Sequence, residues 1–213
     1  FCSYCGVPLR TSDAIGSYLE KSFKGQIECL LDAADKLASK KIMYSSNQGV
    51  LFSFLKQFEN TQCLQGTIKE RCKQLENIEE LELSKESLDL IIVEELLMYV
   101  KNPQQVLDGL ANLLKPGGML LATVPIYEGI NTRTRTNTKK RIYRNGVLVQ
   151  TDWGMDAEKY VEHAGMTSKM ICCRRWYKPP EQPDVDKTYE QCCNMHPYYY
   201  YKFNSWVLIG TKR

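Results

Sequence analysis

Short runs of apolar residues alternate along this chain with longer segments in which apolar residues recur every three or four positions. The first pattern predicts buried strands, and the second predicts amphipathic helices. The clearest strand covers residues 88–93, an unbroken apolar run that is typical of a parallel strand covered on both faces. A helix over residues 103–114 and a strand over residues 119–124 follow it. Lys115-Pro116-Gly117-Gly118 separates the two, because proline cannot continue a helix and glycine permits the positive φ of a sharp turn.

The same alternation extends over the rest of the chain. Further strands are expected at residues 41–44, 62–65, 168–172 and 205–210, and further helices at 14–24, 26–39, 50–58, 68–75 and 156–164. Asn145-Gly146 predicts the turn of a β-hairpin over residues 142–149. Strands that alternate with helices predict an α/β fold with a doubly wound, mostly parallel sheet. We expect one domain over residues 1–213, with an N-terminal helical segment at 1–40 and a basic loop and hairpin insertion at 126–155.

Length and cysteine content narrow the class of protein. The chain has 213 residues, enough for a substantial core, and no apolar run of the length that a transmembrane helix needs. It begins without methionine or a signal-peptide pattern, so we expect a trimmed chain or a piece of a longer protein. Nine cysteines, an odd number that includes two vicinal pairs, form no familiar disulfide framework. Reduced thiols and a cytoplasmic location are therefore expected.

Basic residues concentrate in the second half of the chain. Residues 101–213 hold 17 Lys and Arg against 10 Asp and Glu, which favours a phosphate-bearing partner. The candidate phosphate-binding residues are Arg133, Arg135, Lys139 and Lys140, which lie among threonines in the insertion. A solvated surface loop is the alternative interpretation.

A zinc site is a second hypothesis. Cys2-x-x-Cys5-Gly6 resembles half of a zinc knuckle, and Cys193 and His196 could complete four ligands. The favoured interpretation is that these cysteines are small buried apolar residues.

The strands and turns at residues 87–92, 113–121, 160–166 and 206–209 together resemble class I S-adenosylmethionine (SAM) methyltransferases. The matching segments include Ser87-Leu88-Asp89-Leu90-Ile91-Ile92 and the Leu-Lys-Pro-Gly-Gly turn. The resemblance implies a Rossmann-like fold in which SAM lies over the carboxyl ends of the first strands, as ligands of open α/β sheets generally do.

The segment that should bind SAM departs from the family pattern. Of a Gly-x-Gly-x-Gly loop only Gly49 is present, with Ser45 and Asn47 at the other two positions and Met43 where an acidic residue is common. Without glycine, a Cβ obstructs the approach of the backbone to the methionine moiety.

Two further positions of the implied cofactor site are also altered. The ribose-binding acid is replaced by Gln65, which can accept through one oxygen only, and Asn77 is the nearest match to the residue beside the adenine. The step of twelve positions from Gln65 to Asn77 is too short for the usual helix and third strand. The resemblance thus implies a degenerate cofactor-binding set of Gly49, Gln65, Asn77 and Glu94.

Glu94 and Glu95 follow the strand at residues 88–93, where the family often places catalytic or substrate-binding residues. The alternative is that Glu95 begins the next helix, favoured there by the helix dipole, with Tyr99 in that helix packing on the sheet. The sequence does not identify a catalytic residue.

The missing glycine loop and the short middle also resemble the vestigial half of nematode phosphoethanolamine N-methyltransferases. That half ends in a Trp-Val-Leu strand, and this chain has Asn204-Ser205-Trp206-Val207-Leu208 near its end. The favoured hypothesis is a non-catalytic methyltransferase-like domain without cofactor. It would support a catalytic methyltransferase domain in the same or another chain, in phosphoethanolamine methylation toward phosphocholine. Two alternatives stay open, an active SAM-dependent methyltransferase of a small molecule and an RNA- or phosphate-binding module. Nucleic acid is the less favoured partner.

Overall fold

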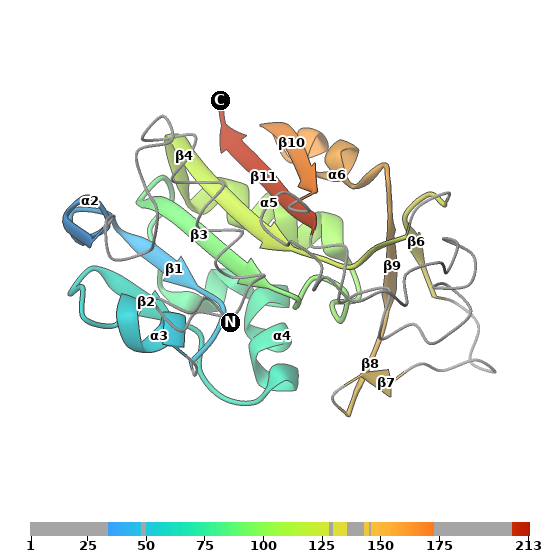
Figure 1. The fold of residues 1–213 in the computed structure, drawn as a ribbon, viewed down its shortest axis with the longest axis horizontal. Coiled ribbons are helices and arrows are strands. Elements are labelled where there is room, and N and C mark those ends of the chain that lie inside the picture. The colour runs from blue at the N-terminus through green and yellow to red at the C-terminus, as the bar shows by residue number, and fades with distance from the viewer. Residues whose placement is uncertain (1–33, 48–49, 128–129, 136–142, 145, 173–205) are drawn as a thin grey trace, which may run out of the picture.

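A six-stranded sheet forms the centre of the protein (Figure 1). The computed structural model describes residues 34–47, 50–127, 130–135, 143–144, 146–172 and 206–213. The strand order is β10-β11-β4-β3-β1-β2. The strands are β1 (Ile42–Tyr44), β2 (Thr61–Cys63), β3 (Leu88–Glu94), β4 (Leu114–Thr123), β10 (Met166–Cys172) and β11 (Trp206–Lys212). Neighbouring strands from β2 to β4 are parallel, and β11 is antiparallel to both of its neighbours.

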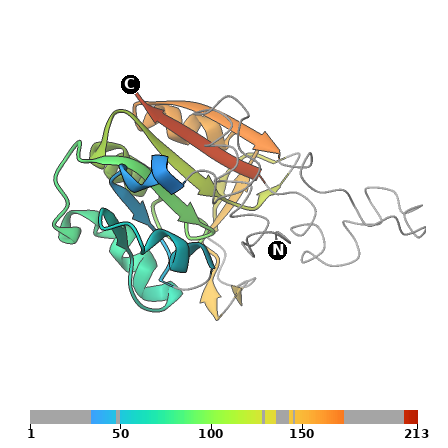
Figure 2. The ribbon, with the colours of Figure 1, turned by 60° about the vertical axis from the view of Figure 1, so that its left-hand side comes forward.

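Helices cover both faces of this sheet. They are α2 (Ala34–Ala38), α3 (Val50–Leu55), α4 (Ile68–Glu76), η2 (Ile78–Leu81, a 3₁₀ helix), α5 (Pro103–Leu113) and α6 (Ala157–His163). Side chains of α4, α5 and α6 pack in one apolar cluster, and those of α2 and α3 in a second cluster. Figure 2 brings α2 and α3 forward. The predicted doubly wound, mostly parallel α/β sheet is confirmed.

Alternation along the central strands explains why the sheet has two apolar faces. In β3, Ile91 and Val93 belong to the cluster under α4 and α5, whereas Leu90 and Ile92 belong to the cluster under α2 and α3. Successive side chains of a strand point to opposite faces, so a strand buried on both faces must be apolar throughout. Residues 90–93 are fully buried, which is the reason that this strand was the clearest in the sequence.

The Pro-Gly-Gly turn joins α5 to the sheet as the sequence predicted. Helix α5 ends at Leu113, and Gly117 has a φ of +76°. The structure differs in detail, because β4 already begins at Leu114 and residues 115–118 bulge out between its first and second pairings with β3. A Cβ on Gly118 would come within 3.0 Å of the Leu88 carbonyl oxygen, so glycine permits this close approach.

The insertion forms two small sheets beside the main one. Strands β5 (Ile126–Tyr127), β9 (Thr151–Gly154) and β6 (Arg133–Thr134) make one of them. The predicted hairpin is present as β7 (Tyr143–Arg144) and β8 (Val147–Leu148), and in both ribbon views it lies next to α4. Within the described part of the chain, no helix is long and apolar enough to cross a membrane.

Candidate functional site

The carboxyl ends of β1 and β3 meet at the point where the strand order reverses. From β1 the chain continues to β2 on one side, and β3 leads to β4 on the other. Open α/β sheets bind their ligands in the crevice outside the strands at such a switch point. Here the two strand ends are joined by the Ser45 N–H, which donates to the Ile92 carbonyl oxygen at 2.9 Å. This crevice is the place to test for a cofactor site.

Polar side chains at this crevice bond to one another. The Tyr44 hydroxyl donates to Glu94 Oε2, and the Glu94 N–H donates to Ser45 Oγ at 2.8 Å. Burial, together with the nearby Glu94 charge, raises the pKa of Tyr44 far above its ordinary value, so Tyr44 stays a neutral donor. Burial also raises the pKa of Glu94, although the Tyr44 hydrogen bond and the charge of Arg71 act in the opposite direction.

Arg71 brings a buried positive charge to the same crevice. Its Nη1 donates to the Ser45 carbonyl oxygen at 2.7 Å, and its side chain is 6 % exposed. The position was missed in the sequence. A signal was available, because Arg71 lies on the inner side of α4 beside Cys72 and close to Leu75, where a charged residue is unusual. Arg71 Nε has no hydrogen-bond partner among the described residues.

The Gln65 side chain is hydrogen-bonded to the end of β2. Its Nε2 donates to the Cys63 carbonyl oxygen at 2.9 Å, and Gln74 Nε2 donates to the Gln65 carbonyl oxygen at 2.8 Å. Gln65 is exposed and supplies no carboxylate. Its side chain therefore closes the end of β2, which is the edge strand of the main sheet.

Asn77 lies at the other end of α4 from Gln65. It is the C-cap of this helix, and its Nδ2 donates to Glu80 Oε1 at 3.1 Å. Nine helical residues span about 13 Å, so the structure does not bring the two amides together. Residues 64–87, all of which are described, form α4 and η2 but no strand. The shortened middle that the sequence predicted is confirmed.

The alternative interpretation, in which Glu95 begins the next helix, is wrong. Residues 95–102 form turns, Glu95 has a φ of +50°, and the helix begins at Pro103 with Asn102 as its N-cap. Glu95 is held there by its N–H, which donates to the carbonyl and hydroxyl oxygens of Thr123 at 2.9 and 3.2 Å. Tyr99 is buried in one of these turns, not in a helix. A non-glycine residue in this region of φ is uncommon and lies here directly at the strand end.

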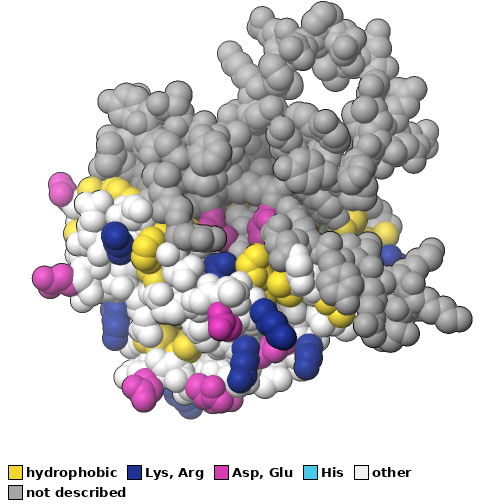
Figure 3. Space-filling view, turned by 90° about the horizontal axis from the view of Figure 1, so that it is seen from below, with side chains coloured by type: hydrophobic (Ala, Val, Ile, Leu, Met, Phe, Trp, Pro, Cys, Tyr) yellow, Lys and Arg dark blue, Asp and Glu magenta, His cyan; other side chains and the backbone are white. Residues whose placement is uncertain are grey.

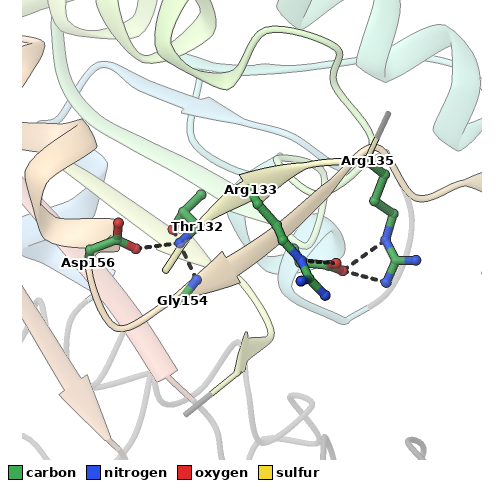
Figure 4. A network of polar contacts seen from close by, with 6 residues as sticks. Thr132, Arg133, Arg135, Gly154 and Asp156 are labelled. Carbon is green, nitrogen blue, oxygen red and sulfur yellow. Dashed lines mark hydrogen bonds and ion pairs between the residues drawn. The ribbon is translucent and has the colours of Figure 1, made fainter. Parts of the chain in front are cut away.

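The two described arginines of the basic segment are paired with a buried acid (Figure 4). Arg135 Nη2 and Nε lie 2.6 and 2.9 Å from Asp152 Oδ1, and Arg133 Nε lies 3.4 Å from Asp152 Oδ2. Asp152 is 2 % exposed on β9. Of its partners, Arg133 lies in β6 and Arg135 follows directly after it. The pairing could not be inferred from sequence because β6 and β9 join only in the folded chain. Beside it, the Thr132 N–H donates to Asp156 Oδ1 at 2.6 Å, which fixes the start of β6 (Figure 4).

The remaining predicted site residues lie outside the described part of the chain. These are Gly49, the basic residues Lys139 and Lys140, and the proposed zinc ligands Cys2, Cys5, Cys193 and His196. Among the residues that are described, no group of three or more His, Cys, Asp or Glu is placed to hold a metal ion.

The strand order and the switch point define an open, doubly wound α/β domain. Residues 55–122 match the family described as "Methyltransferase domain". No curated protein is significantly similar to the chain in sequence.

Solved structures with the same fold include the Burkholderia thailandensis 1,6-didemethyltoxoflavin-N1-methyltransferase with bound 1,6-didemethyltoxoflavin and S-adenosylhomocysteine. It is 14% identical, with a TM-score of 0.51, over 96% of this chain and 87% of that one. A putative methyltransferase in complex with the Haloferax volcanii Trm112 activator is 15% identical, with a TM-score of 0.47, over 96% and 97% of the two chains. A putative sarcosine dimethylglycine methyltransferase from Galdieria sulphuraria is 13% identical, with a TM-score of 0.47, over 94% and 98%. The chain has the fold of class I SAM-dependent methyltransferases, as its sequence predicted.

At three positions where the sequence resemblance implied contacts with SAM, the described residues bond to other parts of the chain or lie apart. The backbone oxygen at the first glycine position, that of Ser45, already accepts a hydrogen bond from Arg71. The position of the ribose-binding acid carries Gln65, whose amide group is bonded to Cys63. Asn77 lies at the opposite end of α4 from Gln65.

Proposed function

We propose that this chain is a non-catalytic methyltransferase-like domain that supports a small-molecule N-methyltransferase. The catalytic domain would lie in the same or another chain, and phosphoethanolamine, methylated toward phosphocholine, is the substrate class suggested by the sequence resemblance. The observation that carries the proposal is the buried Arg71 guanidinium on the Ser45 carbonyl oxygen at the switch point.

Charge is the first argument. SAM carries a sulfonium, an α-ammonium and an α-carboxylate group, so its methionine end has a net charge of about +1. In a poorly solvated crevice, a fixed guanidinium disfavours a second cation much more strongly than it would in water. The Arg71 guanidinium thus already donates to the Ser45 carbonyl oxygen, to which a cationic group of the cofactor would otherwise donate.

Occupancy is the second argument. The Tyr44 hydroxyl donates to the Glu94 carboxylate, and the Ser45 hydroxyl accepts from the Glu94 backbone N–H, so these groups are already bonded across the two strand ends. A ligand entering there must break these bonds and desolvate Glu94, without a carboxylate at Gln65 to bind a ribose in return. An RNA-binding function is less supported, because Arg133 and Arg135 already share the charge of Asp152.

Calorimetric titration with SAM and with S-adenosylhomocysteine tests the proposal. We expect no saturable binding of either compound at concentrations up to about 1 mM. S-adenosylhomocysteine lacks the sulfonium charge. Binding of S-adenosylhomocysteine without binding of SAM would therefore show that the crevice is open and that only the positively charged SAM is excluded.

A SAM dissociation constant below about 100 μM, equivalent to about −5.5 kcal/mol, would support an active enzyme instead. Transfer of labelled methyl groups from SAM to phosphoethanolamine by this chain alone would have the same meaning. The matched control is Arg71→Met, which removes the guanidinium and keeps most of the side-chain volume. SAM binding gained by this variant would identify Arg71 as the excluding group.

A further inference from the structure

A second hollow lies away from the switch point, between α4 and the β7–β8 hairpin. Its volume is about 810 Å³, and its lining includes Lys69 and Lys73 from α4, Lys101, Tyr99, and Val147 and Leu148 from β8. Figure 3 views the molecule from the side on which α3, α4 and the hairpin lie. Basic side chains come close together on this face, with acidic and apolar side chains between them.

The lysines of this groove are unpaired within the described part of the chain. No hydrogen bond or ion pair is formed there by the ammonium groups of Lys69, Lys73 or Lys101. Lys69 and Lys73 are one helical turn apart, a spacing at which two like charges weaken a helix slightly. An anion bound between the two ammonium groups would attract both of them and offset their mutual repulsion.

The two acids of the groove are turned toward other partners. Glu70 Oε2 accepts from the N–H and hydroxyl of Thr67 at 2.7 and 2.9 Å in the capping box of α4, and these hydrogen bonds lower the pKa of Glu70. Glu76 Oε1 accepts from the Lys101 N–H at 2.6 Å. The carboxylates therefore hold the groove in shape and leave the lysines available.

The floor of the groove is apolar and chemically inert. Cys72 and Tyr99 are 6 % and 5 % exposed, and Val147 and Leu148 are half-buried on the facing hairpin. Burial raises the pKa of the Cys72 thiol to about 12, so this cysteine is not a nucleophile at neutral pH. The groove is suited to binding and not to covalent chemistry.

We propose that this groove binds a small phosphate monoester, with its phosphate between the lysines and its short organic part against Tyr99 and Leu148. Three ammonium groups suit a dianion better than a single carboxylate. The volume lies in the range of small-molecule sites. A nucleic acid strand fits less well, because Glu70 and Glu76 leave the lining residues with a net charge of only +1 (three Lys against two Glu). The inference does not depend on the function proposed above.

Titration of the full chain with glycerol 3-phosphate and phosphoethanolamine, monitored by calorimetry, tests this inference. We expect dissociation constants of about 0.1–1 mM that weaken with added salt, and no binding of glycerol or ethanolamine. Lys69→Gln and Lys73→Gln should each weaken binding about fivefold, the upper end for an exposed ion pair, and together about 25-fold. Lys85→Gln, which removes the same charge from an exposed residue outside the groove, should change the constant less than about twofold.

Glu76→Gln changes the charge of the groove in the opposite direction. It keeps an oxygen that can accept from the Lys101 N–H and removes a negative charge, so the phosphate ester should bind about fivefold more tightly. Absence of binding at about 10 mM ester would overturn the inference. An equal loss in Lys85→Gln, or unchanged binding in Glu76→Gln, would also overturn it. So would a short single-stranded RNA that binds when neither phosphate ester does.

Discussion

Replacing Glu94 by glutamine should stabilise the protein at neutral pH. The carboxylate lies in a position where burial raises its pKa, and only the Tyr44 hydroxyl and the charge of Arg71 offset that effect. Glutamine keeps an oxygen that can accept from Tyr44 but needs no counter-charge. Incompletely compensated burial of a polar group costs about 1–3 kcal/mol, and the two partners place Glu94 at the lower end, so we expect a gain of about 1 kcal/mol. For a chain of this length that gain raises the melting temperature by about 2–4 °C.

The gain should depend on pH with a defined sign. Below the ordinary glutamate pKa of 4.5, Glu94 is protonated in both the folded and the unfolded chain, so the variant and the wild type should be nearly equal in stability. As the pH rises above that value, the unfolded chain ionises first, because the folded-state pKa is higher. The wild type thus loses stability up to the folded-state pKa, and the difference stays constant above it.

Urea unfolding of both proteins at neutral pH and at about pH 4 measures this difference. Glu79→Gln, at an exposed position of η2, is the matched control and should change stability little at either pH. A Glu94→Gln variant less stable than the wild type at neutral pH would refute the reasoning. That result would mean that the ionised carboxylate holds the crevice together through Tyr44 and Arg71.

Three further substitutions test the insertion. Arg135→Met should lower the free energy of unfolding by about 3 kcal/mol, because it leaves the buried Asp152 with a single, longer contact to Arg133. Arg133→Met, at the more exposed partner, should cost at most about 1 kcal/mol, and equal losses in urea unfolding would contradict this assignment. Gly154→Ala should cost about 2–3 kcal/mol in the same assay, because its Cβ would overlap the Ile130 carbonyl oxygen. A loss below about 0.5 kcal/mol would show that β9 can shift away from this contact.

The sequence was sufficient for the parts of the fold that depend on local patterns. The apolar run of β3, the amphipathic α5 and the Pro-Gly-Gly turn each contain their own signal, and each is present. The ends of helices and strands differ from the sequence prediction where contacts with neighbouring parts of the fold determine them. Helix α3 ends at Leu55 although apolar spacing extends to Phe58, and β4 begins before the turn because Leu114 pairs with Leu88.

The polar network at the switch point was only partly predictable. The departures from the family pattern at the expected glycine and ribose-binding positions are visible in the sequence at single positions, whereas the hydrogen bonds at the switch point join residues far apart in sequence. The Tyr44 hydroxyl bonds to Glu94, fifty residues later, and the Ser45 carbonyl oxygen bonds to Arg71 of α4, the helix that follows β2 in the chain. Such pairs leave no local signal, and a two-residue strand such as β6 is too short for a periodic one.

Strand β2 is an edge of the main sheet, and an exposed edge invites other chains to pair with it. At β2 the outward-facing groups belong to Thr61 and Cys63. The Thr61 N–H donates to the Phe58 carbonyl oxygen, and Gln65 donates to the Cys63 carbonyl oxygen. Among the described residues this leaves one carbonyl and one N–H, room for a single pair of ladder bonds. By bonding to the Cys63 carbonyl oxygen, Gln65 thus helps to protect this edge against edge-to-edge aggregation.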